Sequence, residues 1–203
     1  IGAGTFTVPI FFVIYNLPFQ DAKGTALTAA IFFVSMGIYR RYLQGKFEPK
    51  MGIVLGIFGM FGAMLGMYLS LVLPQAIPVL VFSILLYFSA YKIWRGKKYV
   101  KKLNIGMHML GLMGFVSGMA TGFLGIGGAI IIGPILLVLG LESHIALSTS
   151  LTTVLFNILS GAVIHALHNH VIWSVALIVG ITGTLGAILG TRIFYILDHE
   201  RLK

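Results

Sequence analysis

Long uncharged stretches make up most of the chain, and short charged segments separate them. Lys, Arg, Asp and Glu are absent from residues 51–91, 103–141 and 143–191. An α-helix needs about 20 apolar residues to cross the hydrocarbon core of a bilayer, so each stretch has room for roughly two crossings. Membrane-spanning β-strands would alternate polar and apolar residues in segments of about ten, and the chain lacks this pattern. The sequence therefore predicts an all-α, polytopic membrane protein.

Proline, glycine and polar breaks divide these stretches into individual helices. A short helix is expected at about residues 3–15. Longer helices are expected at about 22–43, 51–72, 75–95, 104–123, 127–140, 144–168 and 172–197. The segment at 127–140 is too short for a comfortable crossing, so we expect it to begin inside the membrane.

Composition and charge agree with this pattern. The sequence is 58% hydrophobic and 9% charged, whereas a soluble domain is about 25% charged. Most basic residues lie in two short connections, which places loops 44–50 and 96–103 in the cytoplasm, in a prokaryotic-type inner membrane. The net charge of +9 therefore indicates contact with anionic lipid headgroups and not with nucleic acid. The chain has no cysteine, which excludes thiol catalysis and Cys-ligated metal.

The sequence repeats itself in three blocks that occur in the same order. Residues 1–9 align with 126–134, Thr25 and Thr28 align with Thr149 and Thr152, and the glycine block 59–66 aligns with 183–190. We therefore predict a first repeat at 1–96, a basic linker at 97–103 and a second repeat at 104–203. Loop charges put corresponding loops on opposite faces, which is typical of inverted repeats. Comparison of the halves predicts an additional helix beyond each end of the chain.

The glycine-rich segment 122–128 lies in the middle of an apolar stretch. Glycine costs a helix interior about 1 kcal/mol relative to alanine, so four glycines in seven residues should open the backbone. In hydrocarbon the freed N–H and C=O groups are tolerated only against protein or a wet cavity. A helix that restarts here presents unpaired N–H groups and the positive end of its dipole, which favours an anion. The first half repeats this pattern at residues 2–4.

Close helix packing is the alternative role for glycines. We prefer it for the blocks 59–66 and 183–190, whose glycines share one helical face. For Gly125, Gly127 and Gly128 we prefer the anion site, because their spacing unwinds a helix.

Hydroxyl and amide groups crowd the predicted helix at 144–168. Thr149, Thr152 and Thr153 share a face, with Asn157 one turn further on. These groups could donate hydrogen bonds to an oxyanion, or the hydroxyls could bond the carbonyls of their own helix. No basic residue is expected deep within a span, and Arg192 is expected to reach the cytoplasmic surface. The anion would then be held by helix dipoles and hydroxyl groups.

The histidines His165, His168 and His170 suggest a metal site only weakly, because no carboxylate or Cys is near them in the sequence. A role for His165 as a proton relay is an alternative. We expect no metal, no cofactor and no enzymatic activity. A membrane serine protease is disfavoured because Ser160 has no activating base assigned.

Several of these motifs together resemble the TauE/SafE sulfite exporter family. They are Leu124-Gly125-Ile126-Gly127-Gly128, Pro134 six residues later, Ser148-Thr149-Ser150-Leu151, and Trp173 after a short polar turn. Ala3 and Ala129 stand where the family has glycine, and Ile172 stands where it has Asp. The resemblance implies secondary transport of sulfite, an organosulfonate or another sulfur-containing anion.

The predicted mechanism is alternating access around a midplane anion site. Its expected residues are Gly2, Ala3, Gly4, Thr25, Thr28, Gly125, Gly127, Gly128, Ala129, Thr149, Ser150, Thr152 and Asn157. The expected partners are the anion and the lipid bilayer, with H⁺ or Na⁺ as a candidate coupling ion and a homodimer as a candidate assembly. The alternatives are an anion channel and a structural or assembly subunit that transports nothing.

Overall fold

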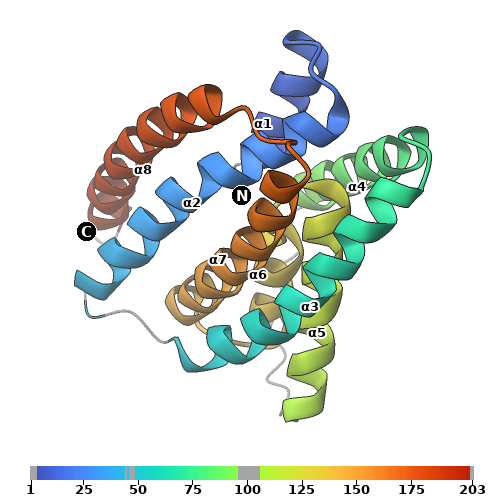
Figure 1. The fold of residues 1–203 in the computed structure, drawn as a ribbon. Helices are drawn as coiled ribbons and strands as arrows, with labels where there is room; N and C mark the ends of the chain where they lie inside the picture. Colours follow the sequence, from blue (N-terminus) through green and yellow to red (C-terminus); the bar gives the residue numbers. More distant parts are fainter. Residues whose placement is uncertain (1–3, 44, 46–48, 96–105, 202–203) are drawn as a thin grey trace.

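The computed structural model describes residues 4–43, 45, 49–95 and 106–201, and its regular elements there are all helices. In chain order they are α1 (Gly4–Pro9), the π-helical turn η1 (Ile10–Ile14), α2 (Phe19–Leu43), α3 (Lys50–Val72), α4 (Ala76–Arg95), α5 (Met107–Leu124), α6 (Ala129–Val138), α7 (Ser143–Leu167) and α8 (Trp173–Arg201) (Figure 1). The predicted all-α fold is confirmed.

Four of the described helices are long and apolar enough to cross a membrane. They are Phe19–Leu43, Lys50–Val72, His144–Leu167 and Trp173–Gly190. By contrast, α6 has 10 residues, which give a length of about 15 Å against a hydrocarbon core of about 30 Å. This helix therefore covers only part of the membrane, as expected for the segment at 127–140.

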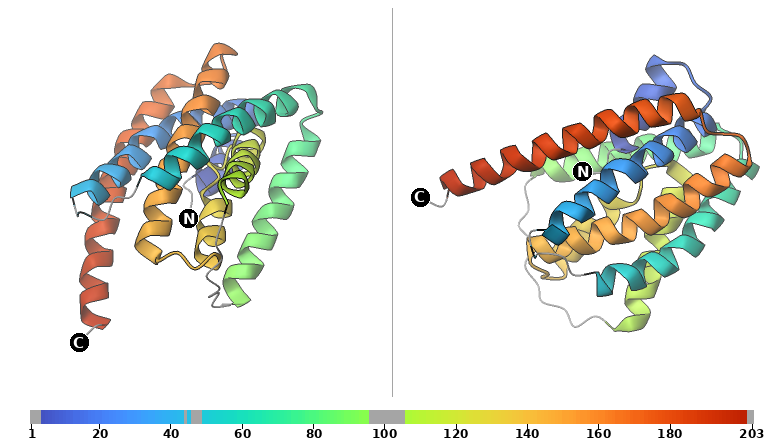
Figure 2. Two further views of the ribbon diagram at one scale, coloured as in Figure 1. Left: turned by 90° about the horizontal axis from the view of Figure 1, so that it is seen from below. Right: turned by 60° about the vertical axis from the view of Figure 1, so that its left-hand side comes forward.

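Helices α2 and α7 run antiparallel through the middle of the molecule. At one end Arg41 Nη1 of α2 donates to the His144 carbonyl of α7 at 3.2 Å. At the other end Asp21 Oδ1 of α2 lies 2.6 Å from Nδ1 of His170, just after α7. Helix α3 packs against α7 and α5, while α8 packs along α2 (Figure 2).

The contact between α3 and α5 is a contact of backbone with backbone. A Cβ on any of five glycines would run into the main chain of the opposite helix: Gly62, Gly66, Gly114, Gly118 and Gly122. The packing interpretation of the block 59–66 is therefore confirmed. In the block 183–190, Gly183 packs on the Phe33 ring, but Gly186 and Gly190 meet no described atom within 4 Å. For these two glycines the packing interpretation stays a prediction, because no described helix covers that face of α8.

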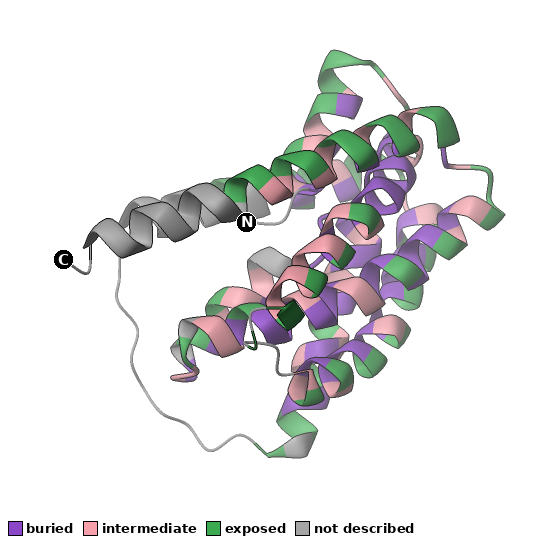
Figure 3. Cartoon of the chain, turned by 90° about the vertical axis from the view of Figure 1, so that its left-hand side faces the viewer, coloured by how far each residue is buried: buried purple, intermediate pink, exposed green. Residues whose placement is uncertain are grey.

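Apolar side chains cover much of the outer surface, and this agrees with lipid as the solvent. On α8 only 11% of the window Trp173–Gly190 is buried, and much of its described length is exposed (Figure 3). Its exposed side chains include Ile178, Ile181 and Leu185. A buried apolar cluster joins α1, α2 and the segment between α5 and α6 through Val8, Phe19 and Ile126. This cluster holds the glycine-rich segment in the interior.

Parts of the sequence interpretation fall outside the described residues. Most of the loop 44–50, the loop 96–103, and the site residues Gly2 and Ala3 are among them. The cytoplasmic placement of the loops and the division into repeats at 1–96 and 104–203 remain predictions.

Gly118→Ala tests the backbone contact between α3 and α5. We expect it to lower the thermal unfolding temperature in detergent micelles, because overpacking a tight contact costs about 1–3 kcal/mol. Gly186→Ala is the matched control, since it makes the same change in a helix where a Cβ meets no described atom. Equal unfolding temperatures for the two variants would contradict the close approach.

Candidate functional site

The chain breaks between α5 and α6 as the glycine spacing predicts. Helix α5 ends at Leu124, and Gly125 follows in the left-handed region with φ 76° while its N–H donates to the Thr121 carbonyl at 2.7 Å. Gly127 and Gly128 both have φ 71°. Because L side chains rarely adopt such values, the turn requires glycine at these positions. We call residues 125–128 the glycine break.

The glycine motif of the first half lies directly against this break. A Cβ on Gly4 would stand 2.7 Å from the Gly125 carbonyl oxygen and 3.1 Å from Ile126 Cα. Helix α1 begins at Gly4, so the start of one short helix touches the turn that precedes another. The two motifs are 121 residues apart in the sequence, from Gly4 to Gly125, and tertiary packing alone brings them together.

Polar groups of α5 and α7 surround the start of α6. Gly128 is the N-cap of α6 and no side chain caps it. A Cβ on Gly128 would stand 2.7 Å from Thr121 Oγ1 and 3.3 Å from Asn157 Nδ2. Asn157 is fully buried; its Nδ2 donates to Ser117 Oγ at 3.4 Å, and its Oδ1 has no hydrogen-bond partner in the described part of the chain. The predicted site residues at the break and Asn157 therefore come together.

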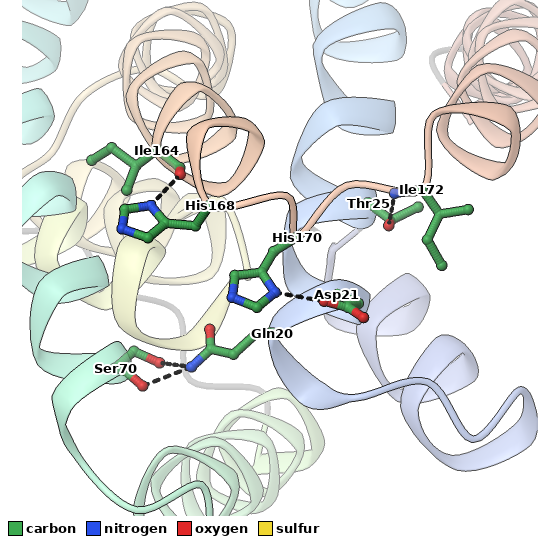
Figure 4. A network of polar contacts seen from close by, with 8 residues as sticks. All are labelled: Gln20, Asp21, Thr25, Ser70, Ile164, His168, His170 and Ile172. Carbon is green, nitrogen blue, oxygen red and sulfur yellow. Dashed lines mark hydrogen bonds and ion pairs between the residues drawn. The ribbon is translucent and has the colours of Figure 1, made fainter.

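The threonine hydroxyls predicted for the site differ in their hydrogen bonds. Thr28 and Thr152 donate to carbonyls one turn back in their own helices, at 2.8 Å and 3.0 Å. Thr25 Oγ1 accepts from the Ile172 N–H at 3.1 Å and so ties α2 to the start of α8 (Figure 4). Thr149 Oγ1 is buried and has no partner among the described atoms. Of these four hydroxyls, only that of Thr149 has no hydrogen-bond partner in the described part of the chain.

The predicted site residues of α7 do not all lie at the break. Thr149 is eight residues from Asn157, or about 12 Å along the helix. It lies beside α3, where a Cβ on Gly52 would stand 2.8 Å from the Thr149 carbonyl oxygen and 2.6 Å from Thr152 Cβ. Ser150 is buried facing α6, with its Oγ 3.7 Å from the Cβ position of Gly133. The residues Thr149, Ser150 and Thr152 thus line a different stretch of the interior from Asn157.

Sequence reasoning missed Lys23, which lies one turn after α2 begins at Phe19 and is 0% exposed. Its Nζ donates to Ser70 Oγ at 2.5 Å and to the Phe123 carbonyl at 3.2 Å. Its side-chain carbons lie on the break, with Cγ 2.6 Å from the Cβ position of Gly125. The signal that could have found it was a lysine inside the predicted span 22–43.

A second buried basic side chain lies close to Lys23. His165 of α7 is 0% exposed, and neither ring nitrogen has a partner among the described residues. Its ring lies 6.2 Å from the ring of His170, centroid to centroid. The described His, Asp and Glu side chains include no group of three that could hold a metal ion.

A hydrogen bond and an ion pair join the start of α2 to the ends of α3 and α7. Gln20 Nε2 donates to the Ser70 carbonyl at 2.6 Å, which fastens the start of α2 to the end of α3. The Asp21–His170 pair fastens α2 to the end of α7, and both of its side chains are partly exposed (Figure 4). This pair lies between buried His165 and the surface.

The chain shares sequence with known membrane proteins. The family described as "Sulfite exporter TauE/SafE" matches residues 1–203. A probable membrane transporter protein of Xylella fastidiosa strain Temecula1 is 44% identical over 105 residues, which are 51% of this chain and 39% of that relative. The probable membrane transporter protein YdhB of Bacillus subtilis strain 168 is 25% identical over 215 residues, covering 100% of this chain and 87% of that relative. No solved structure matches the chain at a significant level.

The glycine break generates a prediction about two neighbouring alanine variants. Both Gly127→Ala and Gly128→Ala place a side chain in the left-handed region, which costs about 1–2 kcal/mol. At Gly127 the nearest described atoms to the new Cβ are 3.5 Å away, whereas at Gly128 Thr121 Oγ1 is 2.7 Å away. We expect Gly128→Ala to lower the thermal unfolding temperature more than Gly127→Ala.

A double-mutant cycle separates strain from the contact with Thr121. Adding Thr121→Ala should recover part of the loss in Gly128→Ala and nothing in Gly127→Ala. Equal effects of Thr121→Ala on both variants would contradict the packing of Gly128 against α5.

Proposed function

The chain belongs to the TauE/SafE sulfite exporter family, and we propose that it carries a small sulfur-containing anion across the membrane by alternating access. It is a multi-pass membrane protein of a transporter family. The proposed passengers are sulfite and organosulfonates. The observation that supports this proposal best is the contact between the two glycine motifs, at Gly4 and Gly125, beside the start of α6.

The start of α6 has the features of an anion site. A helix N-terminus carries unpaired N–H groups and about half a positive elementary charge. Gly128 leaves this end without a side-chain cap and lets a ligand approach the backbone closely. The Asn157 amide supplies an N–H donor beside it, whereas the hydroxyls of Ser117 and Thr121 donate to carbonyls of their own helix. A helix N-terminus with one amide binds an anion weakly and reversibly, which a carrier requires because it must also release its passenger.

The packing of the helices supports two inverted repeats. In the sequence alignment α1, α2 and α3 correspond to α6, α7 and α8. Helix α3 packs on α7 while α8 packs on α2, and α1 packs on α2 while α6 packs on α7. Exchanging the two halves therefore exchanges equivalent contacts, as a pseudo-two-fold axis requires. Alternating access would then be a rocking of one repeat against the other around the glycine break.

Counterflow in proteoliposomes tests the proposed transport. Vesicles preloaded with sulfite should take up radiolabelled sulfite with saturable kinetics, and a second sulfur-containing anion should compete. Uptake that rises linearly without saturation would favour a channel, and the lack of any anion flux would overturn the proposal. Repeating the assay with imposed H⁺ or Na⁺ gradients identifies the coupling ion.

Gly128→Val is the variant that tests the site. We expect it to reduce counterflow to the background of empty vesicles, because the branched side chain fills the space before the first N–H groups of α6. Gly186→Val is the matched control, since a Cβ at Gly186 meets no described atom within 4 Å. Flux is normalised to the protein inserted in the vesicles. Wild-type flux in Gly128→Val would exclude the glycine break as the anion site.

A further inference from the structure

The ammonium group of Lys23 is a buried charge without a carboxylate partner. Among the described residues Asp21 pairs with His170 and Glu142 with His144, and no ion pair reaches Lys23. Its neighbours are neutral: the Ser70 hydroxyl, the Phe123 carbonyl and the ring of Phe19, whose centroid is 5.1 Å from Nζ. A buried amine without an opposite charge either costs several kcal/mol as an ammonium or releases its proton. A bound anion would hold Lys23 in its charged form, and no ion pair of the described chain does so.

His165, which packs against the residue that follows Lys23, presents unused hydrogen-bonding groups. A neutral imidazole has one N–H donor and one acceptor nitrogen, and leaving a buried donor unpaired costs about 1–3 kcal/mol. Both nitrogens of His165 are unpaired in the described structure. The contact between helices at this point is close, because a Cβ on Gly24, the residue after Lys23, would stand 2.9 Å from His165 Cβ.

Capping of α5 explains only part of this arrangement. The Phe123 carbonyl belongs to the last turn of α5, and a cation near a helix C-terminus is favourable. A neutral amide could do the same at lower desolvation cost, as Gln20 does for the Ser70 carbonyl. Capping also leaves both nitrogens of His165 unused. An oxyanion would satisfy the charge of Lys23 and a donor of His165 together.

We propose that Lys23 and His165 form a charged binding site for a small sulfur oxyanion, next to the glycine break on the side of the Asp21–His170 pair. The identity of the anion rests on the proposed function. One oxygen would accept from Lys23 Nζ and another from an N–H of His165, and the negative charge would compensate the ammonium. Because the charge is required, neutral molecules of the same shape are rejected.

The position of Lys23 links this site to the break. Its side-chain carbons lie on Gly125, and its Nζ holds the carbonyl of Phe123, two residues earlier. Drawing the ammonium toward an anion would loosen its hold on the end of α5. The partly exposed Asp21–His170 pair forms the rim, with the His170 ring beside that of His165.

Calorimetric titration of the purified chain in detergent micelles tests the site. The probe is sodium sulfite at constant ionic strength, and dimethyl sulfoxide serves as a neutral sulfur compound. Wild type should bind sulfite and not dimethyl sulfoxide. Lys23→Met keeps a side chain over Gly125 but removes the charge, and it should weaken sulfite binding by about 10- to 100-fold, the effect expected for one charge-assisted hydrogen bond.

Three further variants separate binding from folding. Lys23→Arg keeps the charge and should retain most of the affinity, while His165→Phe removes the donor and should weaken binding by about tenfold. Ser70→Ala removes a hydrogen-bond partner of Lys23 but not its charge, so its affinity should stay within about threefold of wild type. Affinities are compared among variants whose unfolding temperatures agree. If Lys23→Met does not fold, His165→Phe and Lys23→Arg still decide the question.

Binding and transport distinguish this inference from the proposed function. Binding that depends on Lys23, in a protein that shows no counterflow of sulfite, would keep the site and overturn the carrier. Saturable counterflow with the same KM in wild type, Lys23→Met and His165→Phe would keep the carrier and overturn the site. A wild-type protein that binds no sulfite, or a Lys23→Met variant that binds it as tightly as wild type, would also overturn the site.

Discussion

Hydrocarbon offers no hydrogen bonds to a polypeptide backbone, and the glycine break depends on how the protein meets this constraint. The chain leaves helical geometry at residues 125–128 in the interior of the molecule. Its main chain is enclosed by the start of α1, by the side chains of Thr121 and Asn157, and by the side-chain carbons of Lys23. Gly4 and Gly125 have no side chains, so the start of α1 can approach the main chain of the break closely. The fold thus keeps an irregular segment away from lipid.

The same constraint gives Lys23 a second role. Its ammonium meets a carbonyl that the end of α5 leaves free, and its stem covers the glycine that turns the chain. A cation at the end of α5 and the N-terminus of α6 therefore stand on two sides of one break. Both favour negative charge, the first as a full charge and the second through the helix dipole.

Sequence and structure agree where the signal is local. The expected helix at 51–72 is observed at Lys50–Val72, and the expected short helix at 127–140 is observed at Ala129–Val138. The hydroxyl groups show the limit of local reasoning. The hydroxyls of Thr28 and Thr152 donate to carbonyls of their own helices, whereas the Thr149 hydroxyl has no partner among the described residues. Side-chain spacing cannot predict this difference, because it depends on the rotamer of each side chain and on the carbonyls within its reach.

The sequence by itself determined the membrane setting, the approximate helix boundaries and the position of the break, because apolar length and glycine spacing act within a few turns of the chain. Only the tertiary structure decided that Gly4 touches Gly125, that Asn157 and not Thr149 lies at the break, and that Lys23 is buried beside His165. These facts depend on which helices meet. The packing of α2 against α7, and of the end of α3 against the start of α2, joins residues far apart in the chain, and no local pattern encodes such a contact.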